Sequence, residues 1–179
     1  GARVGEVAVA PDHTTRVDAW IPAGALMGMA GLDFVTAITP PGYAAVNQVT
    51  PTVVSEGVAT HRADVAQAHG VTGRGVIVGV TSSGTQTVNL DSLALSQARR
   101  ELPASCPLTV GPNAKCVFGG ATPCVCDIGA GNGHEGTAML EIVHDVAPGA
   151  DLLFLASSGV AGHVNALNGL AAAGANVIT

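Results

Sequence analysis

The chain has 179 residues, of which 47% are hydrophobic and only 11% are charged, so it has ample material for a buried core and does not belong to the disordered class. Its formal net charge is -6 and only seven residues are Lys or Arg, which argues against a nucleic-acid partner because phosphate binding needs clustered basic side chains. No run of about 18–20 apolar residues that could span a membrane is present. The first residues lack a basic start followed by an apolar stretch, so the sequence indicates no signal peptide.

Residues 1–45 predict a small α/β unit in the order strand, strand, helix, strand. Polar and apolar residues alternate with a period of two in its second strand, and Pro22 and Gly31 bound its helix. The predicted strands cover 4–9, 16–21 and 34–38, and the predicted helix covers 23–30. Such a unit is too small to hold a large core alone. We interpret residues 46–54 as a linker.

Residues 55–179 predict one α/β domain. The predicted helices cover 58–69, 91–102, 135–146 and 160–173, and the predicted strands cover 75–81, 151–156 and 176–179. Buried strands that alternate with helices indicate a parallel β-sheet with helices on both faces, a three-layer architecture. Functional groups in such sheets gather at the carboxyl ends of the strands. The segments 81–84 and 157–159 are therefore expected at the functional edge of the sheet.

Four cysteines lie close together, at positions 106, 116, 124 and 126. An even number of cysteines in a segment rich in Gly and Pro favours disulfides, and with them an oxidising, extracytoplasmic compartment. A thiolate metal site is the weaker alternative, because the paired C-x2-C spacing of zinc sites is absent. Three pairings are open, and the sequence does not choose between them.

Two motifs carry a family resemblance. The segment 70–84, GVTGRGVIVGVTSSG, and the segment 133–157, GHEGTAMLEIVHDVAPGADLLFLAS, together resemble the subtilisin-like serine peptidases. The resemblance covers residues 55–179. It implies a secreted endopeptidase that cleaves polypeptides by acyl transfer through a serine without a cofactor. Calcium sites are common in the family, but the loops that would hold them are not recognisable here. It also implies that residues 1–45 are similar to a propeptide.

The chain departs from the family pattern at the positions that carry the chemistry. Ser82 stands where the family has its catalytic Asp, with Ser83 beside it, and Glu135 stands in the position of the catalytic His, with His134 one residue earlier. The related sedolisins use a Glu in that position, but the Asp that they place four residues later is Met139 here. A carboxylate base predicts an acidic pH optimum.

The Gly-Thr-Ser motif that carries the family's nucleophile does not occur in the 179 residues. We therefore expect this chain to be a fragment, the front part of the peptidase domain, and to be inactive as given. The alternative is a non-catalytic homologue in which the fold persists as a binding or scaffold module.

Several polar residues have both a functional and an ordinary interpretation. Asp91 and Asp127 are candidates to replace the missing Asp, although Asp residues also occur as turn and helix-capping residues. Glu141 and His144 have the Glu-x-x-His spacing of some metal sites, but a surface pair at helical spacing is the simpler explanation. His163 is expected to be an ordinary surface or packed histidine.

Overall fold

The computed structural model describes residues 2–10, 13–39 and 54–179. Its centre is a four-stranded sheet whose strands, in spatial order, are β6 (Val125–Asp127), β7 (Asp151–Phe154), β3 (Ile77–Val80) and β8 (Val177–Ile178). All three pairings between these strands are parallel. The predicted α/β class with a parallel sheet is therefore confirmed.

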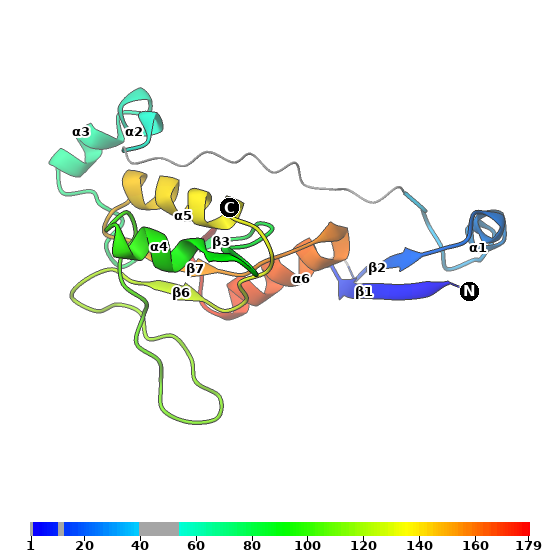
Figure 1. Ribbon diagram of the computed structural model, residues 1–179. Helices are drawn as coiled ribbons and strands as arrows, with labels where there is room; N and C mark the ends of the chain where they lie inside the picture. The colour runs from blue at the N-terminus through cyan, green and yellow to red at the C-terminus, as the bar shows by residue number, and fades with distance from the viewer. Residues whose placement is uncertain (1, 11–12, 40–53) are drawn as a thin grey trace.

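Helices cover both faces of this sheet (Figure 1). On one face lies α5 (Glu135–Val146), with α4 (Ser92–Ala98) beside it, and on the other lies α6 (Gly159–Ala172). The side chains follow the strand period of two. Leu152 and Phe154 share a core with Leu140 of α5, whereas Leu153 between them packs with Leu170 of α6. The predicted three layers follow from this alternation.

The N-terminal unit differs from the prediction in its last element. An antiparallel hairpin of β1 (Arg3–Val9) and β2 (Thr15–Trp20) is followed by the 3-10 turn η1 (Ala23–Ala25) and by α1 (Leu26–Ala30). The strand predicted at 34–38 is wrong, because these residues form turn and irregular backbone and pair with no strand in the described ranges. Strand propensity alone does not make a strand, since an extended segment also needs a hydrogen-bonding neighbour.

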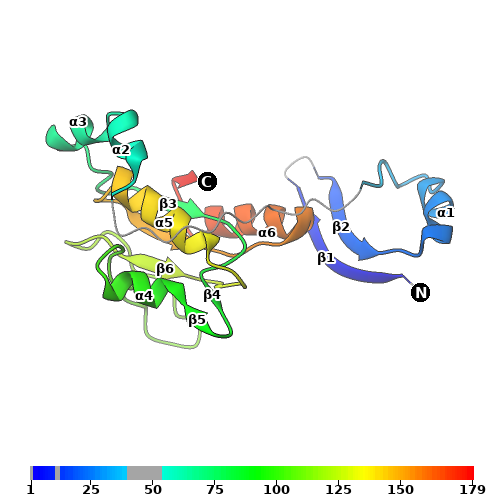
Figure 2. The same ribbon diagram turned by 45° about the horizontal axis from the view of Figure 1, so that its top comes forward.

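The hairpin packs on α6, on the side of the molecule away from α2 and α3 (Figure 2). Ala8 of β1 is buried in this contact region, and the Asn165 and Asn168 amides of α6 donate hydrogen bonds to the Val7 and Val9 carbonyls. The second strand contributes a carboxylate, since Asp18 Oδ2 accepts a hydrogen bond from the Ala161 amide at 3.3 Å. The N-terminal unit is thus held to the sheet domain by its strands.

The helix predicted over 58–69 is two short helices, α2 (Glu56–Thr60) and α3 (Ala63–Ala68). The chain breaks at Arg62, whose φ of 58° lies in the left-handed region. The next predicted helix is also shorter than expected and ends at Ala98 rather than at residue 102. The predicted linker 46–54 lies, except for its last residue, outside the described residues.

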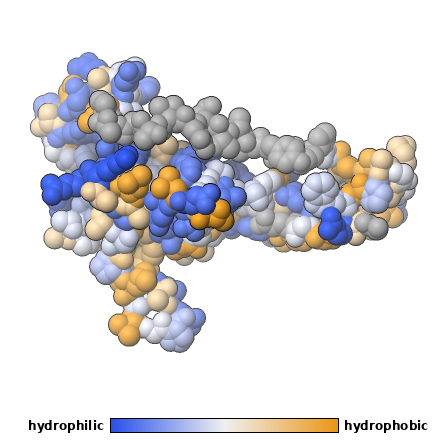
Figure 3. All heavy atoms as spheres, in the orientation of Figure 1, coloured by the Kyte–Doolittle hydropathy of each residue, from blue (hydrophilic) through white to orange (hydrophobic). Residues whose placement is uncertain are grey.

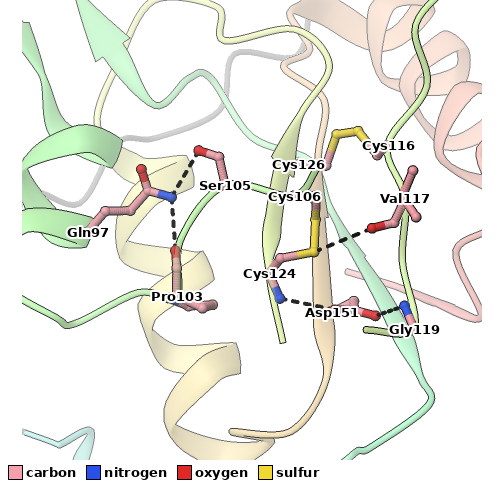
Figure 4. Close-up of a disulfide and its surroundings, with 10 residues drawn as sticks. All are labelled: Gln97, Pro103, Ser105, Cys106, Cys116, Val117, Gly119, Cys124, Cys126 and Asp151. Carbon is pink, nitrogen blue, oxygen red and sulfur yellow. Dashed lines mark hydrogen bonds between the residues drawn. A yellow bond between two sulfur atoms is a disulfide. The ribbon is translucent and has the colours of Figure 1, made fainter. Parts of the chain in front are cut away.

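The cysteine-rich segment contains structure that the sequence analysis missed. β6 lies inside it and forms an outer strand of the sheet, and the bridges are Cys106–Cys124 and Cys116–Cys126. Asp151 supports the same region, because its buried carboxylate accepts hydrogen bonds from the Cys124 and Gly119 amides (Figure 4). The predicted disulfides are present, and the pairing is one of the three that were open.

Between Cys106 and Cys116 the chain forms a projecting loop, residues 107–115, whose surface is partly hydrophobic (Figure 3). Its base is closed by an antiparallel bridge between Leu108 and Cys116. A second small pair of strands, β4 (Gln86–Thr87) and β5 (Leu90–Asp91), leads into α4. Among the described residues, no helix is both long and apolar enough to cross a membrane.

Candidate functional site

The carboxyl edge of the sheet brings the end of β3 and the start of α5 together. The Ser82 hydroxyl donates a hydrogen bond to Glu135 Oε2 at 2.8 Å, across 53 residues of sequence. The Gly136 amide donates to the Gly84 carbonyl, also at 2.8 Å, so the two backbones touch beside the side-chain contact. The strand end and the helix start therefore share one edge, as their order along the sequence predicted.

Two glycines allow this close approach. A Cβ atom on Gly84 would lie 2.6 Å from the Asn132 amide nitrogen, and one on Gly136 would lie 2.7 Å from the Gly84 carbonyl oxygen. Real Cβ atoms do not come so close to backbone atoms. Gly84, two residues after Ser82, and Gly136, directly after Glu135, therefore allow the two backbones to approach closely enough for the Ser82–Glu135 hydrogen bond.

His134 faces a different partner from its neighbour Glu135. Its Nδ1 lies 3.0 Å from the Ser92 hydroxyl, at the start of α4. The Ser92 hydroxyl has one proton, which it donates to the Thr85 carbonyl. The Ser92 hydroxyl also lies 2.8 Å from the Thr137 hydroxyl of α5. His134 thus braces α4 against α5, and no hydrogen bond joins it to Ser82 among the described residues.

The two candidate substitute acids are engaged elsewhere. Asp127, at the end of β6, accepts a hydrogen bond from the Thr85 hydroxyl at 2.6 Å and from the Gly129 amide at 2.9 Å. Asp91 is the N-cap of α4 and accepts from the Ala94 amide at 2.9 Å, which is its ordinary interpretation. Neither carboxylate has a hydrogen bond to Ser82 or Glu135 in the described part of the chain.

Ser83 borders a hollow at the same edge. Its hydroxyl is buried and has no hydrogen-bond partner among the residues that the structure describes. It lines a cavity of about 410 Å³, here called the edge pocket, with residues from three segments. The residues lining the edge pocket are Ser83, Gly131, Asn132, Ala156, Ser157, Ser158 and Gly162. The lining residues are small, and serine and asparagine side chains among them offer hydroxyl and amide groups within a mostly apolar surface.

The Glu141–His144 pair lies on α5, apart from this edge. Burial raises the pKa of Glu141 above its usual 4.5, and this carboxylate accepts a hydrogen bond from Ser96. Burial lowers the pKa of His144 below its usual 6.5. Within the described ranges, no group of three or more His, Cys, Asp or Glu side chains is placed to hold a metal ion. Calcium binding stays a prediction from the resemblance.

The sequence analysis placed the segments 81–84 and 157–159 at this edge, and the structure confirms that placement. Thr81, Ser157 and His163 form a hydrogen-bonded chain beside the edge pocket, and Thr85, which the sequence analysis missed, is almost fully buried with its hydroxyl against Asp127 and the Ala130 carbonyl. Thr81 and Ser157 follow strands β3 and β7 at their carboxyl ends, which is the signal that the sequence analysis used. No local signal marked His163.

Comparisons of this chain with protein-family models, with curated proteins and with solved structures found no match.

Proposed function

We propose that this chain is the N-terminal part of a secreted subtilisin-like serine endopeptidase, with Glu135 as the base that activates a serine from the downstream part of the domain. The observation that carries the proposal is the 2.8 Å hydrogen bond between Ser82 and Glu135 at the carboxyl edge of a parallel sheet. These are the two positions at which the subtilisin-like motifs place their acid and base. Their contact supports a shared catalytic role.

The chemistry of the two replacements is complementary. A catalytic imidazole needs a carboxylate that accepts a hydrogen bond from its N–H group and stabilises its positive charge. A carboxylate base needs the opposite, a donor that fixes its orientation, and the Ser82 hydroxyl donates to Oε2. An Asp at position 82 would instead set two carboxylates side by side, which cannot both ionise at this distance without cost. Ser82 therefore suits Glu135 better than the usual Asp.

In the proposed mechanism, Glu135 accepts the proton of the nucleophilic serine as that serine attacks the peptide carbonyl, and later returns it to the leaving amine. Ser82 holds one carboxylate oxygen. A carboxylate base remains competent at acidic pH, where an imidazole base would be protonated. We therefore expect peptidase activity with an acidic optimum. The docked hairpin β1–β2 takes the role of a propeptide-like element.

The test uses the full-length gene product with a serine-directed fluorophosphonate probe and a peptide substrate. We expect the probe to label one serine beyond residue 179, and we expect Glu135→Gln to reduce peptide cleavage by about 10²–10⁴-fold. An Asp64→Asn variant, on the exposed side of α3, serves as the control for loss of a carboxylate. A cleavage rate that is highest at neutral or alkaline pH contradicts Glu135 as the base.

The second candidate is a non-catalytic homologue that binds polypeptides without cleaving them. The replacement of the usual Asp by Ser82 favours it, because the family's usual charge pair is lost. A full-length protein that binds peptides, and in which the fluorophosphonate probe labels no serine beyond residue 179, supports this candidate, whereas labelling of a single downstream serine excludes it.

A further inference from the structure

Thr81, Ser157 and His163 form a second polar chain at the carboxyl edge, separate from the Ser82–Glu135 pair. The Thr81 hydroxyl lies 3.0 Å from the Ser157 hydroxyl, and Ser157 Oγ lies 3.3 Å from His163 Nδ1. The parallel pairing of β3 with β7 brings Thr81 and Ser157 to the same edge. The Ser157 amide donates to the Ser82 carbonyl at 2.8 Å, which fixes the backbone that carries the hydroxyl.

The first turns of α6 bring His163 next to Ser157, which precedes the helix. Gly159 has a φ of 67°, in the left-handed region that favours glycine, and the helix begins at this residue. The helix then places His163 beside Ser157, six residues earlier in the sequence. The three side chains thus come from a strand end, a loop and a helix whose positions the sheet fixes.

The direction of the hydrogen bonds gives Ser157 the arrangement of an activated nucleophile. Thr81 is buried and donates its proton to Ser157 Oγ. The proton of Ser157 is then free to point at His163 Nδ1, which accepts it in the tautomer that carries its hydrogen on Nε2. A hydroxyl that donates to an imidazole is the arrangement of a serine nucleophile with its base, and such contacts are often longer before a substrate binds.

The edge pocket supplies space and donors next to this hydroxyl. Ser157 is one of its lining residues, and the small side chains around it leave a cavity of about 410 Å³. Asn132 and Ser158 line the same cavity and add an amide and a hydroxyl group to it. Hydroxyl and amide donors of this kind can stabilise the oxyanion that forms when a carbonyl is attacked.

We propose that Ser157 is a nucleophile that accepts acyl groups from small activated esters, with His163 as its base. Ser157 Oγ attacks the ester carbonyl carbon, its proton passes to His163 Nδ1, and the C–O bond to the leaving alcohol breaks as the imidazolium protonates that alcohol. The product is acyl-Ser157. Water, deprotonated by the same imidazole, then hydrolyses it to the free acid and restores the serine. This step uses neither Glu135 nor a serine beyond residue 179.

The experiment treats the 179-residue chain with p-nitrophenyl acetate, follows p-nitrophenolate release, and maps acetyl groups by peptide mass spectrometry. We expect a burst of release with acetylation of Ser157, no acetylation at this position in Ser157→Ala, and a rate about 10²–10⁴-fold lower in His163→Gln. The matched controls are Ser105→Ala, beside the first residue of β6, and His69→Gln, on the surface after α3. Both should keep the wild-type rate.

Two results overturn the proposal. One is a chain, shown by circular dichroism to be folded, in which Ser157 is not acetylated. The other is acetylation of Ser157 at the wild-type rate in His163→Gln, which would mean ordinary surface reactivity. Because the reaction is measured at Ser157, its failure leaves the Glu135 proposal intact, and a failure of the downstream-serine labelling leaves this one intact.

Discussion

Asp18, in the second strand of the N-terminal hairpin, accepts a hydrogen bond from the amide of Ala161 in the first turn of α6, across 143 residues of sequence. A helix leaves its first amide groups without partners inside the helix, and a carboxylate there also meets the positive end of the helix dipole. One side chain of the hairpin thus satisfies a helix in the sheet domain. This contact ties the N-terminal unit to the element that carries His163.

Replacing Asp18 tests this contact. We expect Asp18→Ala to weaken hairpin docking by about 0.5–2 kcal/mol, the usual loss when a helix-capping group is removed, and we expect Asp18→Asn, which keeps an acceptor oxygen, to lose less. Hydrogen exchange of the β1, β2 and early α6 amides measures the change. Asp33→Ala, in the same unit but after α1, is the control. Equal protection in Asp18→Ala and the wild type would contradict the docking role.

The hydrogen bond between Ser82 and Glu135 should contribute measurably to the stability of the fold. We expect Ser82→Ala to lower the free energy of unfolding at neutral pH by about 1–2 kcal/mol, because a half-buried carboxylate loses its hydroxyl donor. In the double variant Ser82→Ala with Glu135→Gln, the combined loss should be smaller than the sum of the single losses. Urea unfolding of the four proteins completes this cycle. Strictly additive losses would show that the two side chains do not interact.

The two disulfides give a prediction about the cysteine-rich segment. Peptide mapping without reduction should recover Cys106 linked to Cys124 and Cys116 linked to Cys126. Removing the second bridge by Cys116→Ser with Cys126→Ser should cost about 2–4 kcal/mol, because the unfolded chain regains the freedom of a closed loop. Thermal unfolding with and without reductant measures the loss. Recovery of either other pairing would refute the structure of this segment.

The pH dependence of stability should report His144. Burial lowers the pKa of His144 below its usual 6.5, so as the pH falls the unfolded chain takes up this proton before the folded chain does. The stability present above pH 6.5 is therefore lost as the pH falls through that value towards the lower folded pKa. Asp145 opposes the shift without cancelling it.

We expect His144→Gln to lose less thermal stability than the wild type between about pH 7 and about pH 5, by a few degrees in the unfolding temperature. The exposed His69→Gln is the control and should follow the wild type. Glu141 affects stability in the opposite direction. Because its folded pKa is raised, it destabilises the fold as the pH rises above 4.5. Glu141 is present in both variants and in the wild type, so its effect does not distinguish them. Identical pH profiles for His144→Gln and wild type would rule out this role.

Regular patterns in the sequence predicted much of the sheet domain. The apolar run at Val76–Val80 was sufficient to place β3, because a strand that is buried on both faces is apolar throughout. The helical spacing of apolar residues from Glu135 to Val146 was sufficient to place α5, because a helix that packs on a sheet has one apolar face. The order of these elements was sufficient to bring Ser82 towards Glu135. The N-cap interpretation of Asp91 followed from local rules and is confirmed.

Other features depended on neighbours that no local window contains. The segment 34–38 has strand-forming residues but pairs with no strand among the residues that the structure describes, whereas β6, in a segment that seemed irregular, pairs with β7. The break at Arg62 and the pairing of the four cysteines are likewise set by packing and by distance in space. The local sequence indicates strand propensity, but a segment becomes a strand only where a neighbouring strand is available to pair with it.

The amino-acid sequence by itself determined the α/β class, the parallel order of the buried strands and the placement of Ser82 and Glu135 near one edge, since hydrophobic period and connection rules act along the chain. Only the tertiary structure decided which partner each polar side chain has: Thr85 for Asp127, Ser92 for His134, Ala161 for Asp18 and His163 for Ser157. The physical reason is range. A hydrogen bond needs its two atoms within about 3 Å, and residues far apart in sequence reach that distance only when the whole chain has packed.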